Sequence, residues 1–518
     1  MKTPSSRLYD LVKSLSSAER RYFKIFINSK DAVNNKYARL FDAILNSDAF
    51  DDEQLLKAVY GDEKAESRKY SELKAYLYEL IIKSLQSYDE STSVDYKLKN
   101  QLLGVRALFK RSHFEDCKAL LLKVKKTAED YEAFNALVEV LDWEKRIAYA
   151  QTDIGFLDRE LKRITAEERE YLDKMTNISA YRNLFFKVLV SIRKDVSRSE
   201  KQRQEFAAMM EHPLMKDENA AYSFLAKVLY YRILSIFYFS SSNFESFYVS
   251  SKKLLGLMER NKRMLKEDVS EYISALNNHI ISCGRLGKVE EVRSTLDKLN
   301  SVKPLTTDDE LKIHRQYFMN KFRLCISTGE FEEGGRELKR HLKLVENFDK
   351  QLFIKSNFYF QYFCIYFGMG NYEQALNSLN DWLKMSESVE RKDLQSLARV
   401  LNLIMHYELG NTMLLDSLLR STYRYLNKAN RLSEFERKMM NFIKEAGKPH
   451  SKKEMQKILE TLKQDFEELS RQPSYGVFDL FDIIAWLESK INGMPYAEVV
   501  KERYKQRSLF MLSHNTGK

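Results

Sequence analysis

Residues 368–383 read GMGNYEQALNSLNDWL, a glycine-containing turn that leads into an amphipathic helix. The same pattern recurs six more times, with a large or β-branched side chain at the position of Tyr372. The seven positions are Phe114, Phe156, Phe244, Val289, Phe331, Tyr372 and Thr412. Their successive spacings are 42, 88, 45, 42, 41 and 40 residues. The spacing of 88 equals two periods of 44 and predicts a further turn near Ser199. A period this regular is typical of a repeat protein.

The residues before and after each turn suit a joint between two helices. Acidic side chains follow several turns, as at Glu290–Glu291 and Glu332–Glu333, and suit the first turn of a helix. Glycines precede four turns by two residues, where a helix C-terminus favours a left-handed residue. They are Gly287, Gly329, Gly370 and Gly410. Each helix pair cannot bury its apolar stripe alone, so we expect neighbouring pairs to stack.

Composition supports a helical chain of 518 residues. Only 16 glycines and 6 prolines are present, whereas strand-rich folds need turn residues every few positions. The sequence therefore predicts an all-α protein that is too long for one compact core.

One copy of the repeat resembles the tetratricopeptide repeat. Between Tyr359 and Leu383, large and small residues match that family's packing positions, which are Tyr359, Tyr362, Phe363, Tyr366, Gly370, Tyr372, Ala375 and Leu379. Other copies depart from the family pattern, since Val292 and Gly334 replace the alanine and Thr412 replaces the aromatic residue. The period also exceeds the family's 34 residues by about two helical turns. The resemblance implies a right-handed α-solenoid of antiparallel helix pairs, with longer helices than usual.

Three segments are expected. Residues 1–90 lie outside the repeat phase and predict an N-terminal helical domain, either a cap or an effector. Capping-box spacings at Ser16 and Asp51 and an apolar stripe from residue 73 to 85 indicate its helices. Residues 91–447 form the repeats. Residues 448–518 predict a C-terminal helical cap, with helices at 451–471, around FDLFDIIAWLESK and from Pro495.

Charge and hydropathy limit the partners. Residues 1–90 hold 15 basic and 15 acidic residues, so the net charge of +11 comes entirely from residues 91–518. A neutral N-terminal domain favours a cap over a DNA reader, because phosphate contacts need a basic face. The small basic groups elsewhere are typical of solvated helix faces. No stretch has the apolar length of a signal peptide or a membrane span, so a cytoplasmic protein without membrane insertion is expected.

No residue cluster in the sequence indicates catalysis. The four cysteines, Cys117, Cys283, Cys325 and Cys364, form no CxxC pair and are expected to be buried apolar residues. The eight histidines form no HExxH pattern, and GMGNYE lacks the last glycine of a dinucleotide loop. Asp479 and Asp482 lie one helical turn apart, but a solvated helix edge explains them better than a carboxylate pair. We therefore expect no enzyme activity, no metal and no cofactor.

A ligand site follows from the resemblance to tetratricopeptide repeats. In that family the first helix of each pair lines a concave groove, with inward positions fifteen, twelve, eight and five residues before the turn residue. Counting back in this chain predicts a ligand-binding set made of Arg232, Asn277, Gln316, Arg323 and Asn357. Arginine and asparagine can hold carboxylates and backbone amides without requiring one sequence. The alternative is that the longer helices shift the register and leave some of these side chains merely exposed.

The sequence therefore predicts a non-enzymatic scaffold that binds a protein or peptide, with an acidic segment or a C-terminus as the candidate ligand. A second interpretation is a peptide-sensing regulator whose residues 1–90 act on DNA or a protein target. Its layout resembles the bacterial peptide-sensing regulators with long tetratricopeptide-like repeats, although no effector motif matches. A third is nucleic-acid binding by the solenoid, which is possible but not favoured. The partner's identity and the oligomeric state do not follow from the sequence.

Overall fold

The computed structural model describes residues 6–28, 36–61, 67–90, 93–194, 200–266, 268–346, 348, 358–385, 392–428, 432–471, 478 and 480–515. Every regular element in these ranges is helical, so the predicted all-α class is confirmed for this part of the chain. The chain divides into two compact units, Met1–Asn243 with Gly256–Val269, and Phe244–Leu255 with Ser270–Lys518. The predicted boundaries near residues 90 and 447 do not coincide with this division and stay predictions.

The first unit begins with five helices that share one core. They are α1 (Arg7–Ser14), α2 (Ser17–Asn28), α3 (Lys36–Asn46), α4 (Asp52–Tyr60) and α5 (Ser67–Glu90). Their buried residues run from Leu8 to Ile81 in a single cluster. The predicted helix starts are confirmed: Ser16 and Glu19 form a reciprocal capping box, and Asp51 accepts from the amides of Glu53 and Gln54.

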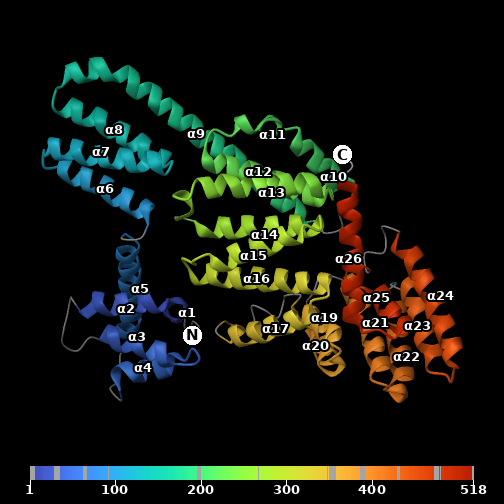
Figure 1. The fold of residues 1–518 in the computed structure, drawn as a ribbon. Helices are drawn as coiled ribbons and strands as arrows, with labels where there is room; N and C mark the ends of the chain where they lie inside the picture. The colour runs from blue at the N-terminus through green and yellow to red at the C-terminus, as the bar shows by residue number, and fades with distance from the viewer. Residues whose placement is uncertain are drawn as a thin grey trace. The chain divides into compact units, whose positions relative to one another are not determined.

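Further helices follow in the first unit, and from α6 to α11 each packs against the next along the chain. They are α6 (Val94–Phe109), α7 (Phe114–Asp130), α8 (Phe134–Ala150), α9 (Ile154–Lys194), α10 (Glu200–Met210), α11 (Pro213–Lys216) and α12 (Phe224–Ser240). Contacts join α6 to α7, α7 to α8, α8 to α9, and α9 to α12 (Figure 1). These are sequential helix pairs, as the repeat predicts.

One part of the predicted repeat is wrong. The turns at Phe156 and near Ser199 predict a separate helix pair between them, but α9 runs unbroken through 41 residues. Residues 169–190 contain no proline or glycine to end a helix, and buried side chains such as Tyr181 and Phe185 continue the apolar stripe. Ser199 itself lies outside the described residues, and α10 begins at Glu200.

The second unit contains the first part of α13 (Phe244–Arg260), as far as Leu255, and all later α-helices. These are α14 (Val269–Arg285), α15 (Val289–Ser301), α16 (Thr307–Thr328), α17 (Phe331–Val345), α19 (Phe358–Gly368), α20 (Tyr372–Met385), α21 (Lys392–Glu408), α22 (Thr412–Lys428), α23 (Glu434–Ala446), α24 (Lys452–Ser470), α25 (Ile483–Asn492) and α26 (Tyr496–Asn515). From α15 to α17 and from α19 to α26, each helix contacts the next. The predicted C-terminal helices are confirmed, and the last of them, α26, packs against α16 in the middle of the unit (Figure 1).

The joints between helices have one geometry in both units. Six of the seven predicted turn residues are the first residue of a helix, and Phe156 lies two residues inside α9. Two residues before the next helix the backbone is left-handed, at Ser112, Glu132, Thr152, Ser242, Gly287, Gly329, Gly370 and Gly410. The amide of the following residue then donates to the carbonyl five positions earlier, as in His113 to Leu108 and Glu330 to Cys325. This is the Schellman closure of a helix, and the four predicted glycines all take part in it.

Candidate ligand-binding surface

Asn320, in the middle of α16, connects two first helices of the repeat. Its side-chain amide donates to Oδ1 of Asn277 on α14 at 2.8 Å and to the carbonyl oxygen of Gln316 at 2.8 Å. Its Oδ1 accepts from Nη1 of Arg323 at 3.3 Å. Asn320 is only 5% exposed, so both amide hydrogens and the carbonyl oxygen are satisfied by fixed partners. The asparagine therefore holds the two helices in one register.

This network joins three of the five predicted ligand-binding residues, namely Asn277, Gln316 and Arg323. Arg232 belongs to the first unit, where its guanidinium lies 4.2 Å from the ring centroid of Phe185. Asn357 lies outside the described residues. Asn320 itself was missed, because it stands eleven residues before Phe331 and the family's steps of twelve and eight pass over it. Its spacing of 43 residues from Asn277 was the available signal.

Two arginines lie at the exposed edge of this network. Arg323 is open to solvent, yet desolvation by the surrounding protein lowers its pKa, and the positive charge of Arg285 on α14 lowers it further. Arg285 is also exposed and lies over the ring of Phe244 at 5.4 Å. Among the described residues, neither guanidinium forms an ion pair with a carboxylate. Two uncompensated positive charges that repel each other would be relieved by a bound anion.

A further amide side chain continues this line on α19. Gln361 follows Asn320 by 41 residues, one repeat, and its Nε2 donates to the carbonyl of Met319 at 3.0 Å. We call Asn277, Asn320 and Gln361 the amide row. The Oε1 atoms of Gln361 and of Gln316 are buried and find no donor among the described residues. The row ends at Asn402, because that side chain turns to Asn380 on the second helix α20 instead.

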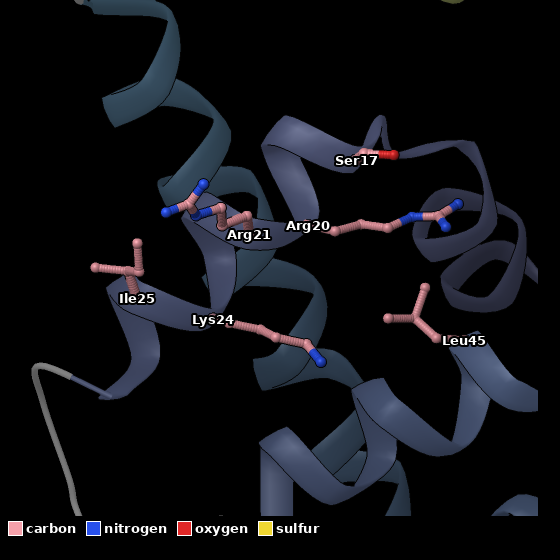
Figure 2. A pocket seen from close by; sticks show the side chains of 6 residues that line it. All are labelled: Ser17, Arg20, Arg21, Lys24, Ile25 and Leu45. Atoms are coloured by element: carbon pink, nitrogen blue, oxygen red, sulfur yellow. The ribbon is translucent and has the colours of Figure 1, made fainter.

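A separate depression of about 600 Å³ lies on α2 in the first unit (Figure 2). Its lining includes Arg20, Arg21 and Lys24, together with the exposed Ile25. Figure 2 shows Arg20 and Lys24 reaching toward Leu45, whereas Arg21 projects to the other side of the helix. Lys24 pairs with Asp42 at 2.8 Å, and Arg20 donates to the carbonyl of Lys13 at 2.8 Å. Two of the three positive charges are therefore already engaged within the domain.

The second unit also buries a chain of aromatic polar groups between α16, α17 and α19. Nε2 of His314 lies 3.0 Å from Nδ1 of His341, and Nε2 of His341 contacts the hydroxyl of Tyr362. Burial lowers the pKa of His314 to about 4 and that of His341 to about 3, so both rings are neutral at pH 7. They are 8% and 0% exposed, which suits core hydrogen bonding rather than contact with a ligand.

The cysteine prediction is confirmed, since all four are buried and free. Thr306 and Asp309 form a capping box at the start of α16, and Asp482 is the N-cap of α25, a structural role that differs from the predicted solvated helix edge. Asp479 lies outside the described residues. No helix in the described part of the chain combines the length and apolarity needed to cross a membrane.

Neither a scan against models of protein families nor a comparison with curated proteins found a match for this chain.

Proposed function

We propose that this protein is a non-enzymatic scaffold built as a right-handed, tetratricopeptide-like solenoid. Its ligand is an extended peptide, acidic or with a free C-terminus, which lies along the first helices α14, α16 and α19. The observation that carries the proposal is the fixed Asn277–Asn320 pair with Arg323 and Arg285 at its edge.

The amide row supplies what an extended backbone needs. A peptide presents alternating N–H and carbonyl groups, and asparagine or glutamine side chains can bind both without reading the sequence. Asn320 is buried and fully hydrogen-bonded, so its part is to fix the position of Asn277, and the half-buried Asn277 and Gln361 are the members of the row that a peptide would contact. The Oε1 atom of Gln361 is buried and finds no donor among the described residues, and it would accept from a peptide amide only after the side chain turned outward.

The arginines supply the selectivity for charge. Arg323 is crowded by protein yet open to solvent, the combination that a side chain inside a groove would have. A carboxylate beside Arg323 and Arg285 would accept charge-assisted hydrogen bonds, which are about twice as strong as neutral ones. An acidic side chain or a terminal carboxylate fits equally well, and the experiment below separates them.

The test uses the full chain and a fluorescein-labelled pool of acidic nonapeptides, with either a free or an amidated C-terminus, followed by anisotropy. We expect Arg323→Glu to weaken binding at least tenfold, about 1.4 kcal/mol or more. The matched control is Arg336→Glu, which makes the same charge reversal at an exposed site on the second helix α17 and should leave affinity unchanged. Loss of binding on amidation assigns the terminal carboxylate, and retained binding assigns the acidic side chains. Equal affinities for the two variants would contradict the proposal.

The second candidate function is a regulator whose N-terminal domain acts on DNA or a protein target. The basic lining of the depression on α2 favours it, but Lys24 pairs with Asp42 and Arg20 with the carbonyl of Lys13, so Arg21 is the one lining cation without an ion pair or hydrogen bond among the described residues. Binding to duplex DNA needs several phosphate contacts, and one exposed arginine supplies too few, so a protein target fits better. A labelled duplex DNA that the full chain shifts at low salt, and that Arg21→Glu no longer shifts, would instead support the DNA version.

A further inference from the structure

Three metal-binding side chain types meet where α14 is joined to α15 in the second unit. His279 and Cys283 stand one helical turn apart on α14, and Glu291 lies in the first turn of α15. The Nε2 atom of His279 is 3.5 Å from the sulfur of Cys283 and 3.8 Å from Oε2 of Glu291. The sulfur lies 3.9 Å from the same carboxylate oxygen. All three ligand atoms lie within 4.8 Å of one another.

These separations are close to the edges of a tetrahedral metal site. Zinc binds nitrogen and oxygen at roughly 2.0–2.2 Å and sulfur at about 2.3 Å, which places ligand atoms about 3.3–3.6 Å apart. Side-chain adjustments of a few tenths of an ångström would bring the three atoms to one ion. The mixed nitrogen, sulfur and oxygen set favours a borderline-soft divalent ion over Mg²⁺ or Ca²⁺.

The surroundings of His279 prepare its Nε2 atom for such an ion. Its Nδ1 lies 3.0 Å from the hydroxyl oxygen of Ser251, which itself donates to the carbonyl of Tyr248 at 2.9 Å. In that arrangement Nδ1–H donates to Ser251, and Nε2 keeps its lone pair toward Cys283 and Glu291. A hydrogen bond of this kind from the second ring nitrogen is the usual support of a metal-bound histidine.

Burial and charge set the conditions for binding. His279 is 5% exposed, whereas the Glu291 side chain is 37% exposed, so an ion can enter from the carboxylate side. Lys288 lies 3.5 Å from Glu291, and Lys252 reaches it through the hydroxyl of Tyr248. Both lysines are exposed and can turn toward solvent.

The next repeat contains the same cluster with one substitution. Lys321, Cys325 and Glu333 each follow their counterparts by 42 residues, and the lysine ammonium pairs with Glu333. A neighbouring carboxylate, Glu330, is held by Arg293 at 2.7 Å. In the second cluster Lys321 stands at the position of His279, and the carboxylates are paired with Lys321 and Arg293. The cluster at Cys283 has a nitrogen ligand and the cluster at Cys325 has none, so the second serves as an internal control for the first.

We propose that His279, Cys283 and Glu291 bind one Zn²⁺ or a similar divalent ion, with the fourth position open to water. The ion would fasten α14 to α15 at one joint of the solenoid. The site contains neither paired histidines nor a CxxC motif, so those patterns do not predict it. The spacing of His279 and Cys283, one helical turn on one face, was the signal that could have found it.

The test is titration of the full-length, reduced and metal-free chain with Co²⁺, followed by absorption spectroscopy. A thiolate ligand gives a charge-transfer band in the near ultraviolet, and tetrahedral geometry gives intense visible bands. We expect both to saturate at one equivalent and to disappear when one equivalent of Zn²⁺ is added. Cys283→Ser should abolish the charge-transfer band, and His279→Gln should weaken Co²⁺ binding at least tenfold.

The matched control is Cys325→Ser, which removes the equivalent thiol of the next repeat and should leave the spectrum unchanged. Far-ultraviolet circular dichroism of each metal-free variant verifies that the helices are intact, so a lost band reports a lost ligand. Absence of a charge-transfer band at stoichiometric Co²⁺, or a band that survives Cys283→Ser, would overturn the proposal.

Discussion

The two units build the same joint from different residues. In the first unit the left-handed position holds Ser112, Glu132, Thr152 and Ser242, whereas in the second unit it holds Gly287, Gly329, Gly370 and Gly410. A side chain at this position costs roughly 1–2 kcal/mol that glycine avoids. The packing of successive helices therefore dictates the turn, and glycine only lowers its cost. The first unit stores strain at four joints that the second unit does not.

The largest effect is expected at Gly329, where conformation and space both require glycine. Its φ is +76°, and an added Cβ would lie 2.8 Å from Cγ and 2.9 Å from the backbone nitrogen of Lys501 on α26. Gly329→Ala should lower the free energy of unfolding by about 3 kcal/mol, from left-handed strain and overpacking together. Urea unfolding followed by circular dichroism measures it. A loss below about 1 kcal/mol would show that α26 does not pack closely on this joint.

The second-largest effect is expected from acid, which should destabilise the second unit more than the first. The described residues of the second unit include two buried neutral histidines, His314 and His341. Folding lowers the pKa of His314 to about 4 and of His341 to about 3, whereas an unfolded chain accepts these protons below about pH 6.5. The unfolded state therefore binds more protons between pH 6.5 and 4, and stability falls as the pH drops through that window. The expected loss is about 2 kcal/mol at pH 5, counting one histidine of the hydrogen-bonded pair.

Hydrogen exchange at pH 7 and pH 5, corrected for intrinsic rates, tests this difference. Peptides from α16 and α17 should lose protection at pH 5, whereas peptides from α7 and α8, which contain no histidine, should keep it. An equal change in both sets would mean that the histidine chain does not control the acid response.

A smaller effect is expected at Gly410, where only conformation matters. Its φ is +68°, and an added Cβ meets no atom within 4 Å. Gly410→Ala should therefore cost about 1 kcal/mol, the left-handed strain alone. The difference between Gly329→Ala and Gly410→Ala in the same urea assay isolates the steric contribution of α26. If both variants lose the same stability, the steric part of the argument is wrong.

The smallest effect is a gain in the first unit. Thr152 is β-branched and left-handed at φ 55°, a conformation that such residues rarely adopt. Thr152→Gly should raise the free energy of unfolding by about 0.5 kcal/mol, because relief of strain exceeds the entropy that glycine adds to the unfolded chain. Thr152→Ala keeps a side chain in the left-handed region and serves as the control. A thermal melt in which glycine is no better than alanine would argue that Thr152 is not strained.

The fold was predictable where local chemistry repeats. Glycine two residues before Val289, Phe331, Tyr372 and Thr412 located four joints to the residue, because few other residues suit a left-handed helix end. The fused helix α9 was not predictable from the period alone, because a repeat implies a turn even where no residue forces one. The period also did not predict the joint at Glu132, where the left-handed residue is not a glycine.

The candidate site was predictable only in part. Counting back from the turns found Asn277, Gln316 and Arg323, since helical periodicity places them on related faces. It missed Asn320, the residue that joins them, because longer helices change the phase between repeats. It also could not find the cluster of His279 with Glu291, because that contact crosses from one helix to the next through a joint.

We propose that the first helices of the second unit bind the ligand, and photo-crosslinking can show which residues lie beside it. Gly284 on α14 is exposed beside Arg285, and a Cβ added there meets no atom within 4 Å. Benzoylphenylalanine at Gly284 should crosslink the labelled acidic peptide pool. The same group at Asp297, exposed on the second helix α15 of that pair, should not. Crosslinking at Asp297 and none at Gly284 would contradict the account.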